Sequence, residues 1–180
     1  MAEFDDFART LLEEAKHFFE KAQTETSKEG KAAYLHAALI VAFCSLEAHI
    51  NAIAEEFLLR RELSVLERSV LEEREFKLQD GEFVLTDNLK MYRLTDRIEF
   101  LHKRFSGKAI DRTAPWWGEL KKAIDYRNSL GHPKEAHEIS AEIAKAALEA
   151  VLDCLQVLYK AIYHRGYPPK PRGLDSIMTF

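Results

Sequence analysis

The feature that most constrains the fold is a long apolar segment in the first third of the chain. The run from Ala32 to Leu46 contains no charged side chain, and His36 and Ser45 are among its few polar members. It is shorter than the roughly 20 apolar residues that a membrane-spanning helix needs. Because the run lies inside a longer helical pattern that is apolar on nearly every face, we expect a buried central helix around which the other elements pack.

Apolar residues recur at intervals of three and four along most of the chain, which predicts amphipathic helices. The chain has only 7 Gly and 5 Pro, and this scarcity favours long helices with few loops. Ser27 or Thr26 can cap the central helix. Pro115 suits the first turn of a later helix, where its missing amide donor is not needed. The predicted helices cover approximately residues 4–24, 28–60, 62–73, 94–105, 115–130 and 139–164.

A different pattern separates the third and fourth helices, where apolar and polar residues alternate around Asp80-Gly81, a dipeptide typical of hairpin turns. We therefore predict an all-α fold, a single helical bundle of about five to six helices with a small β-hairpin insertion near residues 76–85. The helical domain covers residues 1–166, with Gly166 ending the last helix. Residues 167–180 are rich in proline and are expected to form an extended C-terminal tail, ordered only where it docks.

Composition favours a soluble, cytoplasmic protein. Hydrophobic residues make up 47% of the chain and charged residues 31%, which excludes a disordered chain and a membrane protein. The first residues are acidic, whereas a signal peptide begins with basic residues followed by an apolar run. Cys44 and Cys154 lie in apolar, helical segments, so we interpret both as reduced thiols in the core.

The charges are unevenly distributed along the chain. The overall net charge of −4 argues against a nucleic-acid partner, but residues 1–88 carry −9, residues 89–134 carry +6 and residues 135–180 carry −1. A local basic segment can attract a polyanion even on an acidic protein. Lys and Arg also decorate ordinary solvated helix faces, so the segment permits an RNA partner without requiring one.

The sequence contains no phosphate-binding glycine loop, no metal-binding His-Glu-x-x-His helix and no nucleophile elbow. None of the seven histidines lies four residues from another on one helix. His132 and His137 are five apart with Pro133 between them, so a metal site there needs a ligand from elsewhere. We therefore expect no metal and no cofactor.

The richest local constellation covers Asp125-Tyr126-Arg127-Asn128-Ser129-Leu130-Gly131-His132-Pro133. Residues five apart on a continuous helix diverge by about 140° around its axis. A helix that ends at Leu130 lets the chain turn at Gly131, so that His132 can fold back toward Arg127. An imidazole that titrates near neutral pH beside a planar cation suits phosphoryl chemistry. Asn128 can position the phosphate or the reacting hydroxyl.

The same residues also have a purely structural interpretation. An arginine near the C-terminus of a helix interacts favourably with the helix dipole, and asparagine can cap carbonyl groups. Glycine is a common helix stop, and His-Pro is an ordinary way to open a loop. The constellation by itself therefore leaves both interpretations open.

The string Arg127-Asn128-Ser129-Leu130-Gly131-His132, placed after one helix and before a long last helix, resembles the motif of the HEPN domain superfamily. That motif has an arginine, a neighbouring polar residue and a histidine four to six residues beyond the arginine. The segment Ser45-Leu46-Glu47-Ala48-His49-Ile50-Asn51-Ala52-Ile53-Ala54 is similar to the central helix of that group. Together the two resemblances cover most of the chain except the first helix, the hairpin and the tail.

The resemblance implies a homodimer that brings the motif residues of two subunits into one composite active site. Active members are metal-independent endoribonucleases, and some are toxins or defence effectors with a cognate antitoxin. By this resemblance His132 is the general base or acid for attack of the 2′-hydroxyl on the adjacent phosphate. Arg127 stabilises the charge that develops, and Asn128 orients the RNA. Many other members are catalytically inactive dimerisation modules, so a module that binds a protein partner or a nucleotide is the alternative.

One position departs from a branch of the family. Members that pair with a nucleotidyltransferase antitoxin have a tyrosine two residues after the motif histidine, and this tyrosine is adenylylated. Here Lys134 occupies that position. The departure argues against that mode of regulation but leaves the cleavage chemistry untouched.

Other residues near the motif are supporting candidates. Glu47 can orient Arg127 or His132, or it can pair with a lysine or arginine of another helix. Trp116 and Trp117 can stack on a base or pack in the core or a dimer interface, and packing is the favoured interpretation. The candidate RNA-binding residues are Lys121, Lys122 and Lys134, and other basic side chains of the same segment can extend a phosphate track.

Overall fold

The computed structural model describes residues 2–58, 62–132 and 138–179, with no side-chain description for residues 2–4. Within these ranges the chain forms six α-helices and one two-stranded antiparallel sheet, which confirms the predicted all-α bundle with a hairpin insertion. A short 3₁₀ turn, Lys170–Arg172, lies in the C-terminal tail. The elements are α1 (Ala2–Thr24), α2 (Lys28–Leu58), α3 (Val65–Glu72), β1 (Arg74–Gln79), β2 (Glu82–Leu89), α4 (Leu94–Ser106), α5 (Pro115–Gly131) and α6 (Ala141–Tyr163).

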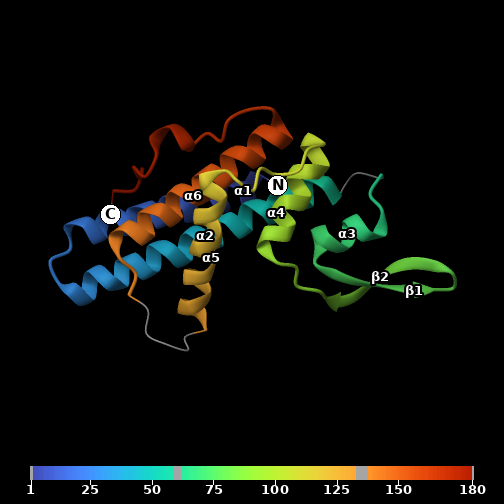
Figure 1. The fold of residues 1–180 in the computed structure, drawn as a ribbon, viewed down its shortest axis with the longest axis horizontal. Coiled ribbons are helices and arrows are strands. Elements are labelled where there is room, and N and C mark those ends of the chain that lie inside the picture. Colours follow the sequence, from blue (N-terminus) through green and yellow to red (C-terminus); the bar gives the residue numbers. More distant parts are fainter. Residues whose placement is uncertain (1, 59–61, 133–137, 180) are drawn as a thin grey trace.

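Helix α2 is the centre of the bundle, as its apolar composition predicts. It contacts each of the other five helices, and its residues Leu39, Phe43, Leu46 and Ile50 are almost completely buried. Figure 1 shows α1, α2 and α6 running side by side, with α4 and α5 crossing them. By length and composition α2 could cross a membrane, but 61% of its most apolar window is buried inside the fold, as in the core helix of a soluble protein.

Local signals set most helix ends. The Ser27 hydroxyl accepts a hydrogen bond from the Gly30 amide, so Ser27 caps α2 as predicted. Pro115 occupies the first turn of α5, also as predicted. The end of α6 differs from the prediction, because the left-handed residue that follows the helix is His164, with φ of 55°, and not Gly166.

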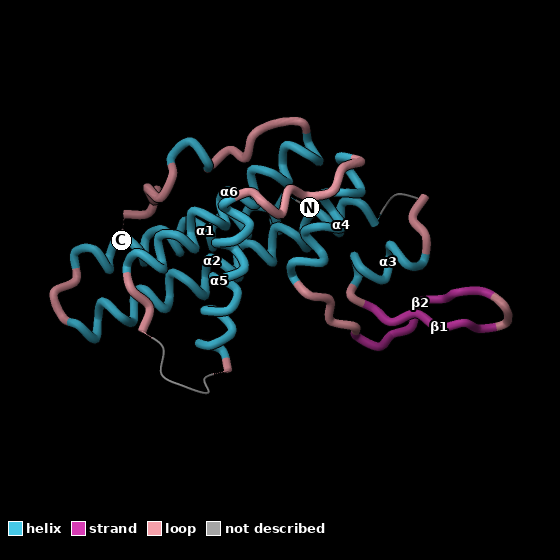
Figure 2. The backbone as a smooth tube through the Cα atoms, in the orientation of Figure 1, coloured by secondary structure: helices cyan, strands magenta, loops and turns pink. Residues whose placement is uncertain are grey.

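The hairpin is longer than predicted and projects beyond the helices (Figure 2). Asp80 and Gly81 form its turn, and both have positive φ values, as a tight hairpin turn requires. Leu78 pairs with Phe83 near the tip, and both side chains are largely exposed.

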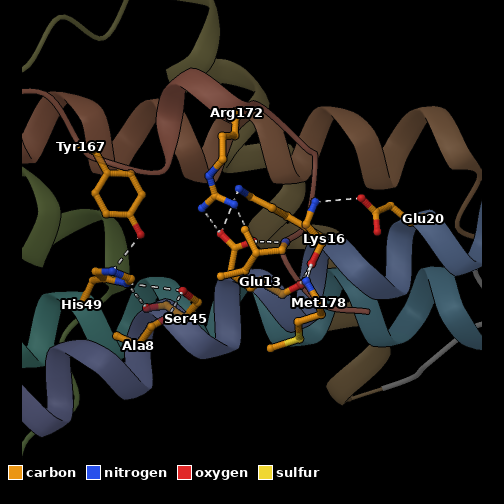
Figure 3. A network of polar contacts seen from close by, with 11 residues as sticks. Ala8, Glu13, Lys16, Glu20, Ser45, His49, Tyr167, Arg172 and Met178 are labelled. Carbon is orange, nitrogen blue, oxygen red and sulfur yellow. Dashed lines mark hydrogen bonds and ion pairs between the residues drawn. The ribbon is translucent and has the colours of Figure 1, made fainter. Parts of the chain in front are cut away.

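The tail docks on the first two helices (Figure 3). Arg172 forms an ion pair of 2.7 Å with Glu13 of α1. The backbone amide of Ile177 donates to the same carboxylate, and the Ser176 hydroxyl donates to the Glu13 carbonyl. Burial acts to raise the pKa of Glu13, but the hydrogen bonds from Arg172 and Ile177 lower it below its ordinary value. Glu13 therefore fixes the tail against α1.

A second tail contact involves His49, whose side chain is buried, with only 1% of the residue exposed. Its Nδ1 lies 2.8 Å from the carbonyl oxygen of Ser45. Because a carbonyl only accepts, Nδ1 carries the proton, and Nε2 accepts from the Tyr167 hydroxyl at 2.9 Å. The Ser45 hydroxyl in turn donates to the carbonyl of Ala8 on α1. The buried imidazole thus joins α1, α2 and the tail (Figure 3).

The cysteines differ in their environments. Both are free thiols. Cys154 is buried, as predicted, and burial raises its pKa. Cys44 is exposed, which corrects its interpretation as a core thiol, because it lies on a face of α2 that the other helices leave uncovered.

Protonation of His49 should oppose folding. Burial lowers the pKa of His49 below 6.5, although the hydrogen bond to Ser45 acts to raise it. Just below pH 6.5, the unfolded chain therefore binds a proton that the folded chain does not. The free energy of unfolding should fall as the pH drops below 6.5, by at most about 1.4 kcal/mol per pH unit. Urea unfolding from about pH 7.5 to about pH 5 measures this slope.

The histidine is tested with a matched pair of variants. His49→Gln should remove this part of the slope and cost about 1–3 kcal/mol of stability at neutral pH, because one amide group does not reproduce both the Nδ1–H donor to the Ser45 carbonyl and the Nε2 acceptor of the Tyr167 hydroxyl. His36 lies on the same helix without a hydrogen-bond partner among the described residues, so His36→Gln should keep the wild-type slope. An unchanged slope in His49→Gln would contradict the assignment.

Candidate functional site

Helix α5 carries the motif and is held against the core by its apolar face. Trp117, Leu120 and Ala123 are buried. Trp116 is partly buried, packs against the same core and meets Trp117 edge-on. These contacts confirm the packing interpretation of the tryptophans. The other end of α5 extends beyond the bundle (Figure 1), and Arg127, Asn128 and His132 lie in or directly after its last turns.

Arg127 is oriented by α2. One of its terminal nitrogens donates to the Glu47 carboxylate at 2.6 Å, and its guanidinium lies 5.5 Å from the centre of the Phe43 ring. Glu47 thus pairs with an arginine of another helix, and this arginine is the motif residue Arg127. Both interpretations of Glu47, pairing with another helix and orienting Arg127, therefore apply. The side chains of Arg127 and Glu47 remain 30% and 42% exposed, and the Arg127 Nε is buried without an acceptor among the described residues.

A second arginine contacts α2 one helical turn beyond Glu47, at Asn51. Arg97 of α4 donates to Asn51 at 2.9 Å and to Glu73, the residue that ends α3, also at 2.9 Å. Its side chain is only 6% exposed. Burial lowers the pKa of Arg97, while the carboxylates of Glu73 and Glu47 act to raise it. The group stays charged, because guanidinium is not deprotonated in proteins.

These side chains line a cavity of about 620 Å³. Its walls come from α2, the end of α3, the segment that leads into α4, and α5. The cavity brings together four of the predicted site residues, namely Glu47, Lys121, Arg127 and Asn128. Its volume lies within the range of about 300–1,000 Å³ that is typical of small-ligand sites.

His132 does not line this cavity. It is exposed, and no described contact joins it to Arg127. The predicted turn at Gly131 is wrong, because α5 runs through Gly131 and the His132 amide donates to the Asn128 carbonyl at 2.9 Å. With the helix continuous, Arg127 and His132 diverge by about 140°. One chain therefore does not bring the two groups together.

The remaining basic candidates do not form one continuous surface, because several of them are paired with carboxylates. Lys122 forms an ion pair with Glu119 and lies beside a different hollow, against α6. Arg104 and Arg112 are also paired, with Glu67 and Glu99. Lys134 lies outside the described residues. The predicted phosphate track is thus interrupted by carboxylates, and Lys121 is the predicted lysine that reaches the cavity. Within the described residues, no group of three or more His, Cys, Asp or Glu side chains could hold a metal ion.

Arg97 and Arg93, which also lines the cavity, were missed by the sequence analysis. Arg97 had a detectable signal, because it shares a helix face with Leu94 and Leu101, three residues before it and four after it. An arginine on an apolar face needs a partner when it is buried. Arg93 precedes α4 in a loop and had no such signal.

The conformation of Gly131 can be tested by adding a methyl group. Gly131→Ala should raise the free energy of unfolding by up to about 1 kcal/mol, because alanine favours a helix over glycine and no described neighbour lies within 4 Å of the added atom. Gly107→Ala is the matched control, since Gly107 ends α4 with φ of 72°, and it should lose about 1–2 kcal/mol. Equal losses in urea unfolding of both variants would show that Gly131 is left-handed in solution.

No family model matches the chain, and neither does any curated protein or any solved structure.

Proposed function

We propose that the protein is a metal-independent endoribonuclease of HEPN type, a toxin or defence effector that acts on RNA in the cytoplasm. The observation that carries the proposal is the placement of Arg127 and Asn128 on the wall of a cavity while His132 is exposed at the end of the same helix. These groups supply an anion-binding donor set and a proton-transfer group on one rigid element.

The divergence of Arg127 and His132 argues for a site shared between two subunits. The end of α5 extends beyond the bundle, where a second copy can approach it (Figure 1). In the proposed dimer, a two-fold axis near this end brings Arg127 of one copy beside His132 of the other at two equivalent sites. We therefore propose a homodimer with two composite sites.

The proposed reaction uses the RNA's own nucleophile. His132 removes the proton of a ribose 2′-hydroxyl, and the oxygen attacks the adjacent phosphorus. The bond to the 5′-oxygen breaks and that oxygen takes up a proton from water, while His132 releases its proton to the solvent, which leaves a 2′,3′-cyclic phosphate and a 5′-hydroxyl. Arg127 donates to the phosphate oxygens as charge develops on them. Glu47 acts through Arg127 by holding its guanidinium in the cavity wall, and Asn128 orients the phosphate.

The first test is RNA cleavage in the presence of EDTA. Wild-type protein should cut RNA but not DNA, because DNA lacks the 2′-hydroxyl. His132→Ala should lower the rate about 10²- to 10⁴-fold, and Arg127→Ala about 10²- to 10³-fold. His36→Ala is the matched control, because His36 lies on α2 away from the cavity, and it should cut at the wild-type rate. Equal rates for wild type and His132→Ala would rule out the role of His132.

The second test mixes two inactive variants. If each site takes Arg127 from one subunit and His132 from the other, a dimer of one Arg127→Ala and one His132→Ala subunit keeps one intact site. Equimolar mixing with subunit exchange should then restore about a quarter of the wild-type activity, because half of the dimers are mixed and each has one working site. Light scattering must show dimers. Mixed dimers without activity would contradict the composite site.

The alternative is a catalytically inactive HEPN-like dimerisation module that binds a protein partner or a nucleotide. It is favoured by the ion pair between Arg127 and Glu47, which already occupies part of the guanidinium. Wild-type protein that is dimeric but cuts no RNA would support this alternative, and a cognate antitoxin would then be sought among its partners.

A further inference from the structure

The cavity contains two cations that no other side chain of the described residues neutralises. Arg93 lies at the start of α4 and Lys121 on α5, so they come from different walls. Neither side chain forms an ion pair or hydrogen bond with a described residue. The other two cations of the wall, Arg97 and Arg127, are paired with carboxylates. Arg93 and Lys121 are therefore the donors that a ligand finds unoccupied.

The charge balance of the cavity favours an anion. Once the paired groups are set aside, Arg93, Lys121 and the exposed carboxylate of Asp125 remain, which leaves an excess of one positive charge. Arg97 forms a rigid part of the cavity wall, because its guanidinium is buried and its hydrogen bonds go to Asn51 and Glu73. A phosphate diester carries one negative charge and accepts hydrogen bonds from Arg and Lys. The volume of about 620 Å³ leaves room for more than a phosphate alone.

We propose that this cavity binds one nucleotide unit of single-stranded RNA next to the bond that is cut, with Arg93 and Lys121 holding its phosphate. The inference rests on the proposed function, because it takes Arg127 as the group that holds the scissile phosphate at the cavity wall. Arg93 and Lys121 then bind the neighbouring phosphate and fix the register of the strand. Asp125 weakens phosphate binding through its like charge.

Binding is measured without cleavage, by fluorescence anisotropy of a short 2′-O-methyl oligoribonucleotide. This probe has no free 2′-hydroxyl, so the proposed chemistry cannot cut it. Arg93→Ala and Lys121→Ala should each weaken binding roughly tenfold and lower the slope of log K against log salt by about 0.7 for each lost phosphate contact. Asp125→Asn should tighten binding, because it removes a negative charge from the cavity.

Lys122→Ala is the matched control, because Lys122 is the next residue on α5 but is paired with Glu119 outside the cavity. It should bind the probe as the wild type does. Equal weakening by Lys121→Ala and Lys122→Ala would overturn the inference, and so would wild-type protein that does not bind the probe. Asp125→Asn without any gain in affinity would also count against it.

A free nucleoside 5′-monophosphate in a separate titration distinguishes the source of the nucleotide. Binding of the monophosphate but not of the oligonucleotide would overturn the RNA assignment. The result is independent of catalysis, since a protein that binds the probe through Arg93 and Lys121 but cuts no RNA refutes only the nuclease proposal. Conversely, cleavage with unchanged binding in both variants refutes only the cavity assignment.

Discussion

Burial of helix α2 is the constraint on which the rest of the structure depends. The helix supplies core residues along most of its length, and every other helix packs against it. The same helix holds the candidate site, because Phe43, Glu47 and Asn51 follow one another at four-residue intervals and contact Arg127 or Arg97. The packing of α2 in the core therefore also positions the site. A change that shifts α2 should move both arginines.

The two arginines of the cavity differ in what surrounds them. Arg97 is buried and satisfied, so removing Glu73 would leave an unpaired charge in the interior, which is strongly unfavourable. The pair of Arg127 and Glu47 is partly exposed, and such pairs contribute little to stability. This difference is consistent with two roles. Arg97 stabilises the cavity wall, and Arg127 keeps hydrogen-bond donors available for a ligand.

Sequence patterns predicted the features that depend on neighbouring residues. The periodicity of apolar residues predicted the helices, Ser27 was a predicted cap of α2, and Asp80-Gly81 predicted the hairpin turn. The missed features depend on distant partners or on small local differences. Gly131 continues a helix at a cost of only about 1 kcal/mol relative to alanine, so glycine alone does not decide where a helix ends. The partner of Glu47 is 80 positions away, and no local pattern identifies it.

The docked tail has a consequence for the order in which the protein folds. Arg172 follows Glu13 by 159 positions in the chain, and Lys16 beside it is fully buried. A chain that emerges from the ribosome exposes α1 long before residues 167–177 exist. Because contacts between distant residues form late, α1 can reach its native environment only after synthesis has passed α6. The earliest helix in the chain is thus among the last to be completed, because the Glu13 carboxylate lacks its partners Arg172 and Ile177 until the tail has been synthesised.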